Sequence, residues 1–215
     1  MCLSYNRGMF DDREDAARKL TLKLLKLVKV KNIVVIALPR GAVAMGKIIA
    51  EYLEAPLDIL VLRKMGAPYN PELAIGVVGP KKTTVWNLDI LKKLRLSKQE
   101  KERIKNEKEQ ERDNLEKILR AGKSPLSLKG KTVILVDDGI ATGATVMAAR
   151  KFLLKENVKR IILATPVIAK DTFKTLDKSF DRIVTLRKPE VFFAVGQFYR
   201  IFPQVTNEEV ISLLK

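Results

Sequence analysis

Apolar and polar residues along the chain follow periods that predict alternating helices and strands. Between Arg13 and Lys29 apolar residues recur every three or four positions, which predicts an amphipathic helix with a basic outer face. The run IVVIALPRG, residues 33–41, predicts a buried strand that enters a loop, and residues 42–53 predict the helix that leaves it. Residues 57–64 predict a second strand that ends in Arg63 and Lys64. Residues 65–80 are too polar and too rich in glycine and proline to predict a regular element, whereas residues 83–86 predict a short strand.

A long charged helix is predicted over residues 97–120. This stretch contains eight basic and seven acidic residues, and Ser97 and Glu100 have the spacing of a capping box. Because the charges nearly cancel and apolar residues are few, we expect most of the helix to be solvated or to lie against another subunit.

The second half of the chain continues the alternation. A loop over residues 122–130 leads to a strand over 132–136 and then to a helix that runs to about Lys155. Residues 160–168, 182–188 and 192–199 are three further strand candidates, and the last helix starts after a cap at Thr206 or Asn207. Strands that alternate with helices predict an α/β fold with a doubly wound, mainly parallel sheet in one domain.

Composition excludes several classes of protein. The chain has 215 residues and 47% hydrophobic content, enough for a sizeable core, and no apolar run approaches the roughly 20 residues of a membrane-spanning helix. With no apolar signal core at its start and a single cysteine, Cys2, we expect a soluble cytoplasmic protein without disulfides or a membrane partner. The absence of histidine excludes Ser-His-Asp triads and histidine-bound metals. Any metal would be held by oxygen, which points to Mg²⁺.

The candidate chemistry lies in VILVDDGIATGAT, residues 133–145, where a predicted strand meets a predicted helix. Ligands of parallel sheets bind beyond the carboxyl ends of the strands, where Asp137 and Asp138 fall. Backbone N–H groups of the next loop, the hydroxyls of Thr142 and Thr145 and the helix N-terminus could bind a phosphate. Two acids beside a phosphate repel it unless they bind something between, such as a ribose diol together with Mg²⁺. The motif therefore indicates a phosphorylated sugar.

The same stretch resembles the signature of the type I phosphoribosyltransferases, which bind phosphoribosyl pyrophosphate (PRPP). The blocks FDDREDAARKL, ALPRGAVAMG, LRKMGAPYNPELAIG and FFAVGQFYRIFPQVTNEEV resemble one poorly characterised subgroup of predicted phosphoribosyltransferases, so the resemblance spans nearly the whole chain. It implies a single domain with a core of about residues 10–85 and 130–187, a helical insertion of about residues 88–121 and a small C-terminal hood of about residues 188–215.

The resemblance also implies which residues bind PRPP. In the phosphate loop they are Asp137, Asp138, Gly139, Ile140, Ala141, Thr142, Gly143, Ala144 and Thr145. A first loop after the first core strand binds pyrophosphate, here Leu38, Pro39, Arg40 and Gly41, and relatives often hold a cis peptide bond there, by position Pro39–Arg40. Basic residues beside the family's mobile lid would reach the diphosphate, with ordinary surface charge as the alternative: Arg63 and Lys64, then Lys81 and Lys82.

The implied reaction is the Mg²⁺-dependent displacement of pyrophosphate from ribose C1 by a nitrogen base, as in nucleotide salvage. Asp137, Asp138 and Arg40 would be catalytic, with the two acids near the metal indirectly or through PRPP. Hypoxanthine and guanine enzymes carry an aspartate where this chain has Ala141, which leaves adenine-type, pyrimidine or unusual acceptors open. Candidates for base binding are Phe192, Phe193 and Tyr199 by stacking and Glu72 by proton transfer, with core packing and surface exposure as the alternatives.

Two other functions remain open. The net charge of +16 favours a regulator that senses PRPP or nucleotides and binds nucleic acid, or it reflects a thermophile-like surface. Core, insertion and hood leave no room for a separate DNA-binding domain, and no aromatic-basic RNA motif occurs, so nucleic acid is not favoured. A catalytically silent subunit would bind PRPP without turnover. We expect a homo-oligomer.

Overall fold

The computed structural model describes residues 9–27 and 31–215, and a five-stranded parallel sheet forms its centre. The strand order is β2-β1-β6-β7-β8, and all four pairings are parallel. The strands are β1 (Ile33–Ala37), β2 (Leu57–Ile59), β6 (Thr132–Val136), β7 (Arg160–Val167) and β8 (Arg182–Arg187). The mainly parallel α/β sheet expected from the alternation of elements is confirmed.

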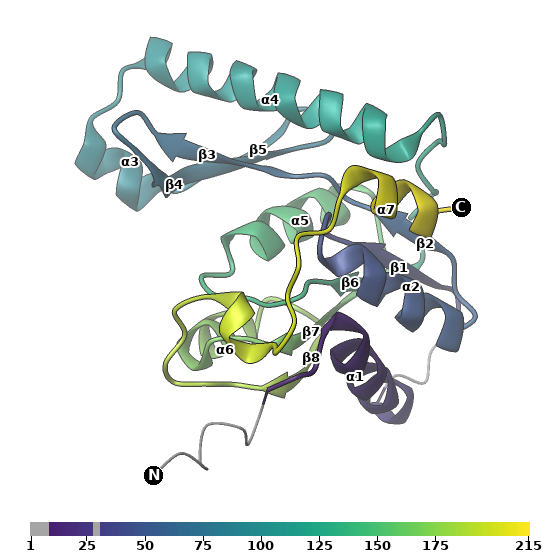
Figure 1. The fold of residues 1–215 in the computed structure, drawn as a ribbon. Coiled ribbons are helices and arrows are strands. Elements are labelled where there is room, and N and C mark those ends of the chain that lie inside the picture. Colours follow the sequence, from purple (N-terminus) through teal and green to yellow (C-terminus); the bar gives the residue numbers. More distant parts are fainter. Residues whose placement is uncertain (1–8, 28–30) are drawn as a thin grey trace.

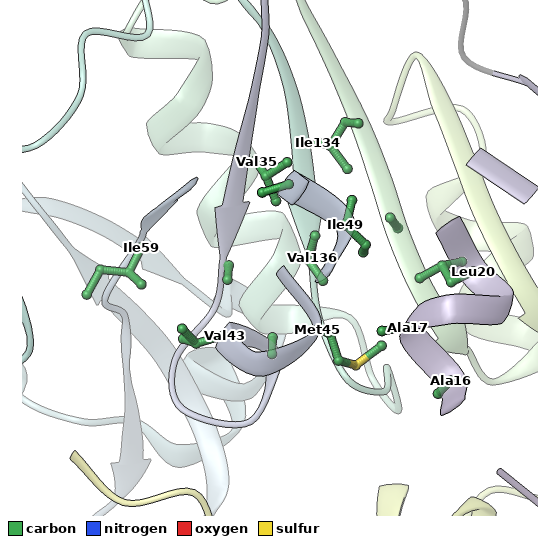
Figure 2. Close-up of a cluster of buried hydrophobic side chains, with 14 of the residues drawn as sticks. Ala16, Ala17, Leu20, Val35, Val43, Met45, Ile49, Ile59, Ile134 and Val136 are labelled. Atoms are coloured by element: carbon green, nitrogen blue, oxygen red, sulfur yellow. The ribbon is translucent and has the colours of Figure 1, made fainter. Parts of the chain in front are cut away.

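Helices cover both faces of this sheet because side chains of a strand point alternately to opposite faces. Val35 and Val136 face the cluster made with α1 (Arg13–Leu27), α2 (Ala42–Tyr52) and α7 (Asn207–Leu213). Figure 2 shows this cluster, in which side chains of β1 and β6 meet those of the first two helices. Val34 and Leu135 face the opposite cluster, made with α5 (Ala144–Lys155) and α6 (Lys170–Leu176). Strands buried on both sides explain the continuous apolar runs in the sequence.

A second, antiparallel sheet lies at one end of the molecule, and the long helix α4 (Lys98–Arg120) crosses it (Figure 1). Its strands have the order β3-β4-β5. Met65, Ile75 and Ile104 belong to the small core that this sheet and α4 share. The elements are β3 (Arg63–Ala67), β4 (Asn70–Gly79), β5 (Thr83–Trp86) and α3 (Leu88–Leu94).

Helix α4 begins with the capping box that the sequence predicts. The Ser97 hydroxyl accepts a hydrogen bond from the Glu100 N–H, and the Ser97 N–H donates to the Glu100 carboxylate. Most of the helix is exposed or half-buried, while Ile104, Arg112 and Leu119 are buried. The apolar side of α4 therefore packs within its own chain, on the small sheet and the core.

Residues 57–80 differ from the sequence prediction. The run 57–64 is not one strand: β2 ends at Ile59, the buried residues Leu60 and Val61 leave the parallel sheet, and Arg63 and Lys64 begin β3 instead of ending a strand. Residues 65–80, expected to be irregular, form most of the β3–β4 hairpin. Strand periodicity cannot reveal that a continuous apolar run changes sheets, since each sheet requires the same extended backbone.

Glycines in this hairpin indicate close packing between strands and not turns. A Cβ atom added to Gly66 would lie 2.4 Å from the Pro71 carbonyl oxygen, and one added to Gly76 would lie 2.6 Å from the Val85 carbonyl oxygen. The same residues that reduce the strand signal in the sequence are therefore those that allow the strands to approach.

The strand expected over residues 192–199 is also wrong. Residues Val195–Phe198 form a short 3₁₀ helix, η1. The Gln197 side chain accepts hydrogen bonds from the N–H groups of Phe193 and Ala194, which closes a tight turn and replaces partners that a neighbouring strand would offer.

Two expectations fall on residues that the structure does not describe. The described part of α1 runs from Arg13 to Leu27, and Lys29, where the sequence places the end of the helix, lies outside the described residues, as does Cys2. In residues 9–27 and 31–215 no helix has the length and apolar character needed to cross a bilayer.

A buried ion pair joins the end of α4 to the core sheet. Arg120 Nη1 donates to Asp58 Oδ1 at 2.7 Å, and Arg120 Nη2 donates to the Ile59 carbonyl oxygen at 3.0 Å. The second oxygen of Asp58 accepts from the Leu126 N–H at 2.8 Å. With side chains only 10–11% exposed, one carboxylate holds together the edge strand, the insertion and the loop that leads back to the core.

We expect Asp58→Ala to lower the free energy of unfolding by about 3–5 kcal/mol, because it removes one carboxylate partner of the buried Arg120 guanidinium, which keeps Glu116, and the acceptor of the Leu126 N–H. The matched control is Asp171→Ala, which removes an acid that is 92% exposed and pairs with Lys174, and which should change stability by less than about 1 kcal/mol. Chemical denaturation of both variants measures the difference. Equal losses would contradict the role assigned to Asp58.

Candidate active site

The register of the central sheet places two loops side by side. Ala37, the last residue of β1, lies opposite Val136, the last residue of β6, and the Leu38 N–H donates to the Val136 carbonyl oxygen. The first loop, residues 38–41, and the phosphate-loop candidate, residues 137–145, therefore leave the sheet at the same edge. This is the edge at which parallel sheets bind ligands.

A cavity of about 270 Å³ lies between these loops. It is lined by Asp137, Asp138 and all the other candidates of residues 139–145, together with Leu38, Pro39, Arg40 and Gly41 of the first loop and Lys64 of β3. Two residues outside the candidate set, Val146 and Val195, also line it. The peptide bond between Pro39 and Arg40 is cis, as the position in the first loop predicts.

The phosphate-loop candidate, residues 137–145, is held in place by hydrogen bonds to the end of β7 and the residues that follow it. The Ile140 N–H donates to the Val167 carbonyl oxygen and the Ile140 carbonyl accepts from the Ala169 N–H, both at 2.9 Å. The Thr172 hydroxyl donates to the Ala141 carbonyl oxygen. Gly143, with φ of 76°, turns the chain into α5, and no side chain caps this helix start. Backbone N–H groups at the start of α5 therefore lie beside the cavity, an arrangement suited to an anion.

Two glycines of the site lie under side chains from distant segments. A Cβ atom added to Gly41 would be 2.0 Å from Asp138 Oδ2, so only glycine lets the first loop approach the acid. A Cβ atom added to Gly139 would be 2.4 Å from Val195 Cγ1, so the hood packs directly on the phosphate loop.

Asp138 is bound on both its side chain and its backbone. Arg13 Nε donates to Asp138 Oδ2 at 2.9 Å, and the two side chains are 11% and 16% exposed. The Tyr199 hydroxyl donates to the Asp138 carbonyl oxygen at 2.5 Å. Asp137 accepts from the Asp138 N–H at 3.0 Å through Oδ1.

Burial dominates the electrostatics of the two acids. Desolvation, followed by the charge of Asp138, raises the pKa of the Asp137 carboxyl well above its usual range. Desolvation also raises the pKa of Asp138, although the Arg13 guanidinium opposes this effect. A cationic or hydroxyl-bearing ligand bound between these two acids would stabilise their carboxylate forms.

The remaining sequence candidates do not line the cavity. Arg63 precedes Lys64 at the start of β3, and Glu72 is exposed on β4. Phe193 is 88% exposed, and the Phe192 ring packs on Phe198 with centroids 4.9 Å apart. Tyr199 is buried, and its ring lies between the rings of Phe10 and Phe202 at 5.4 and 4.8 Å. Lys81 pairs with Glu156 at a distance from the two loops, in the β4–β5 turn.

Arg13 and Val195 were missed at the sequence level. Each touches the motif through the fold alone: 125 residues separate Arg13 from Asp138. Arg13 opens an ordinary amphipathic helix, and no local pattern distinguishes it from the other basic residues of that helix.

The residues described offer little protein coordination for a metal. Among them no group of three or more His, Cys, Asp or Glu side chains is arranged to hold an ion. Asp137 and Asp138 supply carboxylate oxygens at the cavity, a donor set that suits Mg²⁺ when a bound phosphate completes the coordination.

Known proteins with similar sequences belong to one family. The family model "Phosphoribosyl transferase domain" matches residues 7–200. A protein of Mycobacterium tuberculosis, named provisionally as a phosphoribosyl transferase, is 38% identical over 206 residues, which are 96% of this chain and 46% of that protein. The chain thus spans about half the length of the curated relatives it matches.

Solved structures agree with the fold. The protein TT1426 of Thermus thermophilus has a TM-score of 0.81 and 35% identity, with 96% of this chain and 97% of that one covered. A hypoxanthine phosphoribosyltransferase of Staphylococcus aureus has a TM-score of 0.50 at 13% identity, with 86% and 77% covered, and shares the fold.

The Tyr199 hydroxyl bond should contribute measurably to stability. We expect Tyr199→Phe to lower the free energy of unfolding by about 1 kcal/mol, because the buried hydroxyl bond to the Asp138 carbonyl is lost. Tyr69→Phe is the matched control, since Tyr69 is 97% exposed and should be neutral. Urea unfolding compares the two, and a loss of equal size at both positions would contradict this role.

Proposed function

The chain belongs to the phosphoribosyl transferase family, and from that premise we propose that it transfers the 5-phosphoribosyl group of PRPP to a nitrogenous base and releases pyrophosphate. The observation that carries the proposal is the cavity itself. It combines two acids, two basic side chains and an uncapped helix start within about 270 Å³.

Each part of PRPP has a matching part of the cavity. The backbone of residues 139–145 and the start of α5 suit the 5-phosphate. Asp137 and Asp138 suit the ribose hydroxyls, which donate to carboxylates. Arg40 and Lys64, which reach the cavity from the first loop and from β3, suit the diphosphate. Arg63 and the residues Phe192, Phe193, Tyr199 and Glu72 remain candidates without a place in the cavity lining.

The proposed reaction is a displacement at ribose C1. The lone pair of the acceptor nitrogen forms the new N–C1 bond while the C1–O bond breaks and diphosphate leaves with the electron pair, and the proton of the acceptor N–H passes to solvent. Arg40 and Lys64 would stabilise the charge that develops on the diphosphate, and the two acids would hold the ribose in line. Mg²⁺, held near Asp137 and Asp138 through PRPP oxygens, would supply additional positive charge when bound.

The acceptor is proposed to differ from the 6-oxopurines. Ala141 stands where hypoxanthine and guanine enzymes carry an aspartate, and its carbonyl accepts from Thr172. An apolar methyl group cannot bond a purine nitrogen, so adenine-type, pyrimidine or unusual acceptors remain the proposed class. Nucleotide salvage, a cytoplasmic location and a homo-oligomeric state belong to the same proposal.

The test is to incubate the protein with PRPP, Mg²⁺ and each nucleobase and to measure the release of pyrophosphate. We expect turnover with at least one base, and a loss of about tenfold to a hundredfold in kcat/KM for Asp138→Asn, because a charged hydrogen-bond acceptor becomes a neutral one. Asp171→Asn changes an exposed acid of α6 in the same way and should leave the rate unchanged. The proposal is overturned if the protein neither binds PRPP nor turns it over and if Asp138→Asn changes nothing.

The net charge of +16 favours a second candidate function, a PRPP-sensing regulator that binds nucleic acid. A site with about six phosphate contacts should lose roughly a thousandfold in affinity between about 50 and 200 mM salt. A filter-binding titration with RNA and DNA measures this slope. No binding at low salt would remove the alternative, whereas PRPP binding without turnover would indicate a silent subunit.

A further inference from the structure

Arg13, the first residue of α1, is held from three sides at the back of the cavity. Its Nε donates to Asp138 Oδ2 at 2.9 Å and its Nη1 donates to the Pro203 carbonyl oxygen at 2.7 Å. The guanidinium lies 3.7 Å from the centre of the Phe202 ring. Two hydrogen bonds in the plane of the group and an aromatic ring on its face leave it little freedom to turn.

Asp138 is fixed by the same arrangement. Its Oδ2 occupies the space above Gly41, and Arg13 Nη2 lies 2.9 Å from the point where a Cβ atom of Gly41 would stand. Arg13, the acid and the first loop therefore meet at one point. The carboxylate orientation is set by a side chain from α1 that acts together with the hood.

Arg13 acts from outside the cavity. It is absent from the residues that line it, and its side chain is only 11% exposed, whereas Asp138 both lines the cavity and contacts Arg13. A direct contact with PRPP is therefore not its role in this geometry, and any effect on the substrate must pass through the acid.

We propose that Arg13 is a positioning residue for Asp138: it binds one carboxylate oxygen against the first loop and leaves the other to accept a ribose hydroxyl of PRPP. This inference rests on the proposed function, because it assigns a ribose to Asp138. It adds a requirement that the signature motif does not contain, namely that α1 and the hood must both be in place for the acid to be oriented.

The contacts of Asp138 predict how the role can be measured. Arg13 binds the carboxylate itself. Asp137 is the neighbouring acid, Arg40 and Lys64 face the same cavity, and the Tyr199 hydroxyl contacts the carbonyl oxygen.

Removal of Arg13 should weaken the contact between Asp138 and the ribose. Without the Arg13 Nε donor, Oδ2 of Asp138 is no longer held against the first loop, so the carboxylate can rotate and its other oxygen loses its fixed position. The affinity for PRPP should therefore fall.

The experiment measures PRPP affinity by calorimetry with Mg²⁺ at one pH for the wild-type protein, Arg13→Met, Arg13→Lys and Arg18→Met. For Arg13→Met we expect a loss of roughly tenfold in affinity, the size of one hydrogen bond to a charged group. Arg13→Lys retains the charge and a donor but not the planar guanidinium, and should restore part of the affinity. Arg18 pairs with Glu14 on the exposed side of the same helix, so Arg18→Met should match the wild type.

The ¹³C NMR signal of the Asp138 carboxyl in ligand-free protein separates this inference from the proposed function. If the wild type binds PRPP and Arg13→Met lowers the melting temperature without changing either the PRPP affinity or the carboxyl signal, Arg13 is merely structural and the inference is overturned. If the wild type does not bind PRPP, the proposed function fails, while the carboxyl signal of the variants still decides whether Arg13 sets the environment of Asp138. Should Arg13→Met fail to fold, Arg13→Lys carries the same comparison.

Discussion

The parallel pairing of β1 with β6 is the constraint on which the candidate site depends. Because Ala37 lies opposite Val136, both strands end at one level, and the loop whose Gly41 lies close to the Asp138 carboxylate leaves the sheet beside the loop that contains Asp138. A shift of one residue would also move every side chain of the strand to the other face, where α5 replaces α1 and α2. The two apolar cores therefore fix the register of β1 against β6, and this register places the two loops that form the cavity.

The second organising interaction is the burial of two adjacent acids. Carboxylates with raised pKa values are costly in the free protein, and the chain stabilises one of them with Arg13 from its first described helix and with a hood whose Tyr199 binds the adjoining carbonyl. The N-terminal and C-terminal parts of the chain meet at this point, although 190 residues separate Arg13 from Pro203. A site that needs both ends of the chain forms only when the whole domain is folded.

Sequence patterns predicted the elements with strong local signals. The capping box of Ser97 and Glu100, the cap at Thr206 and the buried strands β1 and β6 all occur as expected, because each depends on neighbours within a few residues. The patterns failed where the fold overrides them: residues 57–64 change sheets, Gly66 and Gly76 allow strands to approach, and Gln197 closes a turn over residues 192–199.

The sequence by itself determined the α/β class, the motif at residues 133–145 and the loop at residues 38–41, since the order of acids, glycines and hydroxyls next to apolar strands is local information. Only the tertiary structure decided that Lys64 reaches the cavity while Arg63 and Glu72 do not, that Val195 lines it, and that Arg13 binds Asp138 from outside it. Side chains from separate elements meet because strand register and helix packing place them, and no local pattern records contacts made across more than a hundred residues.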